Sequence, residues 1–240
     1  MTAPDVHSGE KPLIIITGVG PGTGACLARR FHAGGYQVAM LARTAERLTD
    51  LERELPNAFA VPCNVADPAA LLAALAHIEE RAGQPKVVIH NAVGGAFGNF
   101  LDIEPQILER NFQVNVMALL HLARWAAPRM QAGGGALIVT GNTSSIRGRA
   151  NFAGFAPTKA AQRILAESIA REMGPKGVHV AYLMVDAVID LAWTRERFKD
   201  ASDEFFIQPA DIAEEVWHIA HQPRSAWSFL TEVRPFREAW

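Results

Sequence analysis

A turn rich in glycine lies near the start of the chain. Residues Thr17–Gly24 directly follow the apolar run Leu13–Ile16 and precede a helical stretch. Glycines let a backbone turn tightly and approach a pyrophosphate, and the start of the following helix offers unpaired N–H groups. Because the turn lies between a strand and a helix, we interpret it as a nucleotide-binding turn, the alternative being a merely structural one. The candidate contacts are Gly18, Gly20, Pro21, Gly22, Thr23 and Gly24.

The end of the second apolar run carries a basic residue. Val38–Ala42 is followed by Arg43. An acidic side chain at this point would accept hydrogen bonds from the ribose of NAD, whereas a guanidinium grips the 2′-phosphate of NADP. The alternative is an ordinary surface arginine beside a helix. On the acid-versus-arginine rule, the sequence favours NADP(H) over NAD(H).

Alternating strands and helices would position the glycine-rich turn and Arg43. Short apolar runs without polar alternation are typical of parallel strands buried on both faces. Their alternation with helical stretches predicts an α/β fold, a single-domain Rossmann-type doubly wound parallel sheet of about seven strands flanked by helices. We expect strands near Leu13–Ile16, Val38–Ala42, Phe59–Cys63, Val87–His90, Ala136–Val139, Val178–Val185 and Trp227–Val233, with helices near 25–33, 68–81, 105–130, 153–173 and 212–221.

We expect a loose tail over residues 1–12 and one domain over 13–240. Within that domain, the polar segment 190–208 lacks a clear strand, which is typical of a mobile lid.

Composition excludes several classes of protein. The 240 residues are 49% hydrophobic, and 23 basic against 25 acidic residues give a net charge of −2, which argues against a disordered chain. A pI near 6.4 gives no bulk electrostatic reason to bind nucleic acid or an anionic membrane. Two cysteines and the absence of a signal peptide or a long apolar span predict a cytoplasmic protein without membrane partners.

Several landmarks together resemble the short-chain dehydrogenase/reductase family. They are the Thr-Gly-x-x-x-Gly-x-Gly spacing at Thr17–Gly24, the run Cys63-Asn64-Val65 where the family often has an Asp–Val pair, Asn91-Ala92 after the fourth strand, Asn115, and Lys159. The resemblance extends from about Leu13 to Phe236. It implies an oxidoreductase in which Asn64 and Val65 flank the adenine, while Asn91 and Ala92 line the path of the ribose and pyrophosphate. Val93 is found where the family usually has glycine.

The family's active site consists of Asn, Ser, Tyr and Lys. The resemblance assigns its Lys to Lys159 and its Asn, which helps to hold a water near that Lys, to Asn115. The Tyr hydroxyl exchanges the substrate proton, and the Lys lowers the pKa of the Tyr and holds the nicotinamide ribose. At the Tyr position this chain has Phe155. A phenyl ring cannot exchange a proton, so the resemblance implies an atypical active site.

The serine position allows two registers. Counting back from the run Ile146–Gly148 places Asn142 there, whereas the pair Ser144 and Ser145 would require a shorter loop to Phe155. We favour Asn142, whose amide can hydrogen-bond a carbonyl oxygen but relays a proton poorly. The candidate replacement proton donors are Thr143, Ser144, Ser145, Asp186, Asp190, or a water held by Lys159 and Asn115.

The segment after the sixth strand also departs from the family. Where Pro-Gly is usual, this chain has the run Asp186–Asp190. Ile189 matches the residue whose backbone often holds the nicotinamide carboxamide. Asp186 would place a carboxylate near the nicotinamide or its ribose, the alternative being that it caps a turn.

We therefore expect an NADP(H)-dependent oxidoreductase that acts on a small carbonyl or alcohol substrate. The alternative is a catalytically silent NADP(H)-binding protein, either a sensor or an assembly partner, because fold does not fix function. The resemblance implies a homodimer or homotetramer formed through the fourth and fifth helices of the family fold, which are those expected here near 105–130 and 153–173. We expect no metal, since His218 and His221 share a helix face without a third ligand.

Overall fold

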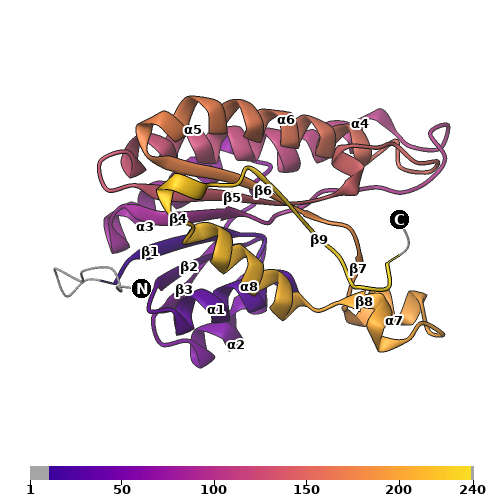
Figure 1. Cartoon of the computed structure of the whole chain (residues 1–240), viewed down its shortest axis with the longest axis horizontal. Helices are drawn as coiled ribbons and strands as arrows, with labels where there is room; N and C mark the ends of the chain where they lie inside the picture. Colours follow the sequence, from indigo (N-terminus) through magenta and orange to yellow (C-terminus); the bar gives the residue numbers. More distant parts are fainter. Residues whose placement is uncertain (1–10, 239–240) are drawn as a thin grey trace.

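The computed structural model describes residues 11–238 and contains a sheet of seven strands, all paired in parallel (Figure 1). The strands are β1 (Leu13–Thr17), β2 (Gln37–Ala42), β3 (Ala58–Pro62), β4 (Pro85–His90), β5 (Gly135–Asn142), β6 (Val178–Val185) and β9 (Leu230–Val233). Their order is β3-β2-β1-β4-β5-β6-β9, so the order reverses between β1 and β4. This arrangement confirms the predicted doubly wound α/β fold.

Helices cover both faces of the sheet (Figure 1). Ile14 and Ile16 of β1 pack on one side and Ile15 on the other, so the strand is apolar throughout. One face carries α1 (Thr23–Ala33), α2 (Glu46–Glu54) and α8 (Pro209–Ala220), and the other carries α3 (Pro68–Ala82), α5 (Ala118–Met130) and α6 (Ala156–Met173). Short 3₁₀ turns lie at Thr143–Ser145, Gly174–Lys176, Asp203–Phe205 and Arg224–Ala226.

The long helix expected over residues 105–130 is interrupted. It consists of α4 (Pro105–Phe112), a π-helical turn over Gln113–Met117, and then α5. Single π-helical turns inside α-helices are frequently found at functional sites. This one contains the buried residue Asn115.

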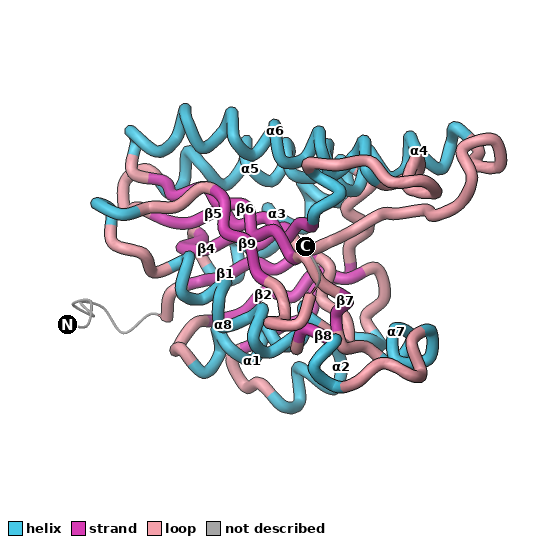
Figure 2. Tube along the Cα trace, turned by 45° about the vertical axis from the view of Figure 1, so that its right-hand side comes forward, coloured by secondary structure: helices cyan, strands magenta, loops and turns pink. Residues whose placement is uncertain are grey.

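The segment 190–208 has more regular structure than we expected. It contains α7 (Ala192–Arg197) and β8 (Phe206–Ile207), and β8 pairs in parallel with β7 (Val188–Ile189). The expectation that this segment lacks a strand is therefore wrong, because its short strand is formed with a partner just before it. Figure 2 shows α7 and the loop before α4 extending from the same side of the molecule. The mobility of the segment stays a prediction.

Two further expectations concern the ends of the chain and membranes. Residues 1–10 of the expected tail lie outside the described residues, and Lys11 and Pro12 are exposed. Within residues 11–238, none of the helices combines the length and the apolar character needed to cross a bilayer.

Candidate active site

A cavity of about 120 Å³ lies where β4, β5 and β6 end and α1 begins. Ligands of open parallel sheets bind outside the carboxyl ends of the strands, near the point where strand order reverses. The cavity brings together six predicted cofactor and catalytic residues from five separate parts of the chain. Its lining residues are Thr23, Asn91, Val93, Thr140, Gly141, Asn142, Lys159, Val185, Ile189 and Ile212.

The glycine-rich turn is fixed to β4 by close backbone contacts. Gly18 has a φ of +73°, and a Cβ at this position would lie 2.5 Å from the Cα of Ala92. Only glycine fits both conditions. The Asn91 Nδ2 donates to the Gly18 carbonyl at 3.0 Å, and the Thr140 Oγ1 donates to the Asn91 Oδ1 at 3.0 Å. These bonds hold the turn, β4 and β5 in one arrangement beside the cavity.

The rest of the turn leaves room for a ligand at one position and is covered at another. A Cβ at Gly20 would meet no atom within 4 Å, and Pro21 is exposed. At Gly22, a Cβ would lie 2.4 Å from the Leu191 side chain, which therefore packs on the turn. The open backbone at Gly20 and the start of α1 fit the pyrophosphate of a dinucleotide.

The residues predicted to bind the adenosine end lie outside the cavity. Arg43 is exposed at the end of β2 and makes no ion pair or hydrogen bond within the described residues. Asn64 is also exposed, and its Oδ1 accepts from the Ala66 N–H at 3.2 Å. Val65 is buried in the core.

Lys159 is a buried cation that has no carboxylate partner within residues 11–238. It is 2% exposed, and its Nζ donates to the Thr140 carbonyl at 3.2 Å and to the Gln162 Oε1. Gln162 is fully buried, and its Nε2 donates to the Asn115 carbonyl at 2.8 Å. Burial removes the hydration of the ammonium and lowers the pKa of Lys159 to about 7.

Asn115 lies behind the cavity and organises the loop after β4. Its Oδ1 accepts from the Gly94 N–H at 2.9 Å, and its Nδ2 donates to the Gly94 carbonyl at 2.7 Å and to the Thr158 Oγ1 at 2.8 Å. Nearby, the buried His90 ring contacts the Thr17 Oγ1 at 3.0 Å and the Val114 carbonyl at 3.1 Å. Burial lowers the pKa of His90 to about 3, so its ring is neutral.

Phe155 and the two serines do not line the cavity. Phe155 is buried at the start of α6, and its ring lies edge-on to Phe97 at 5.3 Å. The Ser144 N–H donates to the Asn142 Oδ1 at 3.1 Å, and the Ser145 hydroxyl contacts the Met184 sulfur at 3.8 Å. Of the two registers considered for the serine position, only the one with Asn142 places its residue at the cavity.

The candidate acids of the following loop are bound to arginines. Asp186 accepts from Arg147 at 3.2 Å and lies 3.9 Å from a guanidinium nitrogen of Arg234. Asp190 accepts from the Nε and Nη2 of Arg195 at 2.6 and 2.7 Å, which lowers the pKa of Asp190 to about 2. Neither carboxylate lines the cavity, and Thr143 does not line it either. Among the described residues, no group of His, Cys, Asp and Glu could hold a metal ion.

Sequence reasoning missed two polar residues that contact Lys159. Gln162 follows Lys159 by three positions, and helical spacing places such residues on one face. Thr140 precedes Asn142 by two positions, which places both on one face of a strand. Both spacings were readable from the sequence, but only the packing shows that the Thr140 backbone carbonyl and the Gln162 side chain meet the Lys159 Nζ.

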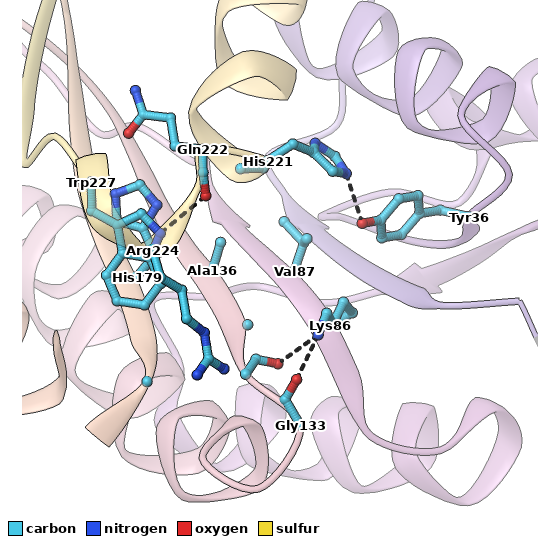
Figure 3. A pocket seen from close by; sticks show the side chains of 14 residues that line it. Tyr36, Lys86, Val87, Gly133, Ala136, His179, His221, Gln222, Arg224 and Trp227 are labelled. Atoms are coloured by element: carbon cyan, nitrogen blue, oxygen red, sulfur yellow. Dashed lines mark hydrogen bonds between the residues drawn. The ribbon is translucent and has the colours of Figure 1, made fainter. Parts of the chain in front are cut away.

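A second cavity, of about 160 Å³, lies at the amino ends of β4, β5 and β6, opposite the first cavity (Figure 3). Lys86 at the start of β4 donates there to the carbonyls of Gly133 and Gly134, at 2.7 and 3.1 Å. Those glycines follow α5, so the ammonium neutralises carbonyls near the end of a helix. None of the predicted site residues lines this cavity.

Comparison with known proteins gives matches in sequence and in structure. A family model described as short chain dehydrogenase matches residues 12–202. A D-erythrulose reductase from Gallus gallus is 32% identical and an L-xylulose reductase from Mus musculus 30% identical, each over 168 residues, 69% of this chain and 67% of that protein. A solved metagenomic short-chain oxidoreductase in complex with NADP has a TM-score of 0.82 at 26% identity, covering 95% of this chain and 99% of that chain. The family match includes the glycine-rich turn and Lys159.

Proposed function

The chain belongs to the short-chain dehydrogenase family and is an NAD(P)-dependent oxidoreductase, and from that premise we propose that it prefers NADP(H) and acts on a small carbonyl or alcohol substrate. The observation that carries this proposal is the cavity in which Lys159 and Asn142 lie next to Asn91 and Thr23. A polar amide and a buried cation are thus held beside the turn that fits a pyrophosphate.

The residues around the cavity divide between holding the cofactor and handling the substrate. When bound, the reduced nicotinamide supplies a hydride to a carbonyl carbon. The Asn142 amide can donate a hydrogen bond to the carbonyl oxygen and orient it. We assign the binding of the 2′-phosphate to Arg43, of the adenine to Asn64 and Val65, and of the nicotinamide end to Asp186 and Ile189. The residues assigned to the riboses are Asn91, Ala92, Val93 and Lys159. The residues assigned to the pyrophosphate are Gly18, Gly20, Pro21, Gly22, Thr23 and Gly24.

The proposed preference for NADP(H) is supported by Arg43 after β2, whose guanidinium is exposed and has no hydrogen-bond or ion-pair partner among the described residues. Titrations with NADPH and NADH, followed by tryptophan fluorescence, test it. We expect Arg43→Ala to weaken NADPH binding by roughly 10- to 100-fold, as expected for loss of a charge-assisted bidentate contact. Binding of NADH should be unchanged. The control is Arg53→Ala, which removes an exposed arginine on α2. Equal weakening of both cofactors by Arg43→Ala would refute the assignment.

A catalytically silent NADP(H)-binding protein is the second candidate. The buried, apolar surroundings of Phe155 favour it, because the helix that carries Lys159 begins with a residue that cannot exchange a proton. NADPH oxidation assayed with a panel of ketones, including ketoses, separates the two candidates. Turnover of any ketone supports the oxidoreductase, whereas tight NADPH binding without turnover supports the silent protein.

We also propose that the chain forms a homodimer or homotetramer through the outer faces of α5 and α6. Ile164 on α6 is 51% exposed, although it is a large apolar residue. Covering such a residue in an interface removes apolar surface from water. Sedimentation of the purified protein tests the proposal, and a monomer at micromolar concentration would contradict it.

A further inference from the structure

Lys159 is the only titratable residue among those that line the cavity at the carboxyl ends of the strands. Phe155 does not reach that lining, and Asp186 and Asp190 are paired with arginines away from it. We propose that the Lys159 Nζ itself exchanges the proton with the substrate oxygen, and that Gln162 is the positioning residue that holds this nitrogen. The proposal rests on the proposed oxidoreductase function and names its acid.

The neighbours of the Lys159 Nζ leave one N–H available. An ammonium has three donors and no acceptor. Two of the donors are used by oxygen acceptors, the Thr140 carbonyl and the Gln162 Oε1. Both neighbours still find donors when the nitrogen is a neutral amine, because an amine keeps two N–H groups. The third position can therefore lose and regain a proton without breaking either bond.

The orientation of Gln162 is set by the π-helical turn. Its Nε2 donates to the Asn115 carbonyl at 2.8 Å, so its Oε1 must face Lys159. The side chain is fully buried, which leaves no water to replace either bond. Gln162 thus fixes the place of the Nζ relative to the helix turn that carries Asn115.

The charges around Lys159 favour release of the proton near neutral pH. Burial without a carboxylate lowers the pKa of Lys159 to about 7, and the His90 ring on β4 is neutral. The groups that contact the nitrogen from β5 and α6 are uncharged oxygens. An acid works best when its pKa is close to the working pH.

A reduced nicotinamide cofactor held beside Lys159 and Asn142 would supply the hydride to the carbonyl carbon. The carbonyl π pair then forms an O–H bond with the proton of the Lys159 Nζ, and the N–H bond pair remains on nitrogen as the lone pair of the amine. The carbonyl is reduced, the cofactor is oxidised, and the amine regains a proton from water.

The first test is Lys159→Arg, because arginine keeps the positive charge but does not deprotonate in proteins. We expect ketone reduction at least ~100-fold slower, the lower bound for a positioned acid, and a much smaller loss of NADPH affinity, because the charge assigned to the ribose is kept. Reduction by Lys159→Arg at a rate close to the original would overturn the proposal while leaving the oxidoreductase function intact. Absence of reduction by the unaltered chain, for any ketone of the panel, would overturn both.

The second test concerns Gln162 and uses the pH profile. In the unaltered chain we expect kcat/KM for reduction to fall as pH rises through about 7. Gln162→Leu removes an acceptor of the ammonium and should shift this fall in kcat/KM, the basic limb of the profile, to lower pH. Gln162→Glu adds a carboxylate beside the ammonium and should shift the limb to higher pH. We expect each shift to be about one pH unit. Gln113→Leu, an exposed residue of the same π-helical turn, is the control. Limbs that coincide in all four proteins would exclude Gln162 as a positioning residue.

A third readout needs no turnover. The chain has five lysines, so ¹⁵N-lysine labelling gives few side-chain signals. We expect one Nζ to titrate near neutral pH, to be missing in Lys159→Arg and to titrate lower in Gln162→Leu. This result would support Lys159 as the group that exchanges the proton, even if the protein binds NADPH weakly. A Lys159 signal that titrates above pH 10 would contradict it.

Discussion

Phe155 is found at the position where the resemblance to the family implies a tyrosine. Its ring packs against Phe97, and a Cβ on Gly95 would lie 2.9 Å from it. The aromatic contacts therefore keep a ring at the start of α6, one helical turn before Lys159, without the hydroxyl that could exchange a proton.

We predict that Phe155→Tyr raises the rate of ketone reduction. The hydroxyl would add a second acid one turn from Lys159, and a positioned acid is worth roughly 10²- to 10⁴-fold when none is present. Because Lys159 already acts as the acid in our proposal, we expect the rate to rise by only about 10- to 100-fold. Initial rates of NADPH oxidation measure it, with Phe152→Tyr in the same aromatic group as the control. No gain with any substrate would mean that residue 155 cannot reach the reacting oxygen.

At the scale of elements, the π-helical turn connects α6 to the loop after β4. Asn115 binds both backbone groups of Gly94, and its own carbonyl accepts from Gln162. One turn of helix thus fixes the backbone that enters the cavity at Val93 and the side chain that holds Lys159.

We predict that Asn115→Ala destabilises the fold. It would leave the partly buried N–H and C=O of Gly94 without their partner, at a cost of up to about 1–3 kcal/mol for each unsatisfied group. Urea unfolding should show a free energy of unfolding lower by about 2–4 kcal/mol. Asn99→Ala removes a single bond from an exposed asparagine to the Leu101 N–H, and it should cost about 1 kcal/mol or less. Equal losses in the two variants would argue against the structural role of Asn115.

The segment 190–208 contains an ion-paired cluster centred on Arg195. Arg195 donates to Asp190 and to Asp203, and so connects the start of the segment with the 3₁₀ turn after α7. Leu191, next to Asp190, packs on Gly22 of the glycine-rich turn. If the segment is a lid, its position over that turn depends on this ion-paired cluster.

We predict that Arg195→Ala loosens the segment without unfolding the sheet. Chymotrypsin should cleave at Trp193 or Phe198 several-fold faster, because local opening sets the rate of cleavage. NADPH should slow this cleavage. Arg171→Ala removes an exposed ion pair on α6 and serves as the control. Cleavage at the original rate in Arg195→Ala would show that the cluster does not hold the segment.

At the scale of the whole molecule, a buried neutral histidine makes stability depend on pH. The pKa of His90 is about 3 in the folded protein and about 6.5 in the unfolded chain. Between these values the unfolded chain binds a proton that the folded protein does not. Stability present above pH 6.5 is therefore lost as pH falls toward 3.

We predict a slope of up to about 1.4 kcal/mol per pH unit from His90 between pH 6 and pH 4. Urea unfolding of the unaltered chain and of His90→Asn measures it, since the variant lacks the titrating ring and should show a shallower loss. His218→Gln, an exposed histidine of α8, should keep the original slope. Parallel curves for the unaltered chain and His90→Asn would mean that His90 is not the group responsible.

The fold and part of the site follow from local patterns in the sequence. The apolar strands, the glycine-rich turn and the place of Lys159 near the start of α6 depend on backbone sterics and on residue spacing within single elements. For that reason the strands and helices predicted from the sequence appear in the same order along the chain in the structure. The sequence predicted one continuous helix over 105–130. It did not predict the π-helical turn within that helix, because the turn depends on contacts with Gly94 and Thr158.

The sequence by itself determined the class of fold, the nucleotide turn and the absence of a tyrosine at position 155. Only the tertiary structure decided which polar groups meet at the cavity. Thr140 reaches Asn91 across 49 positions of chain, and Asn115 reaches Thr158 across 43. It also decided that Asp186 and Asp190 are bound by arginines. Except for Asp190 and Arg195, which are 5 positions apart, these pairings join segments far apart in sequence. Residue spacing along one element contains no information about such contacts.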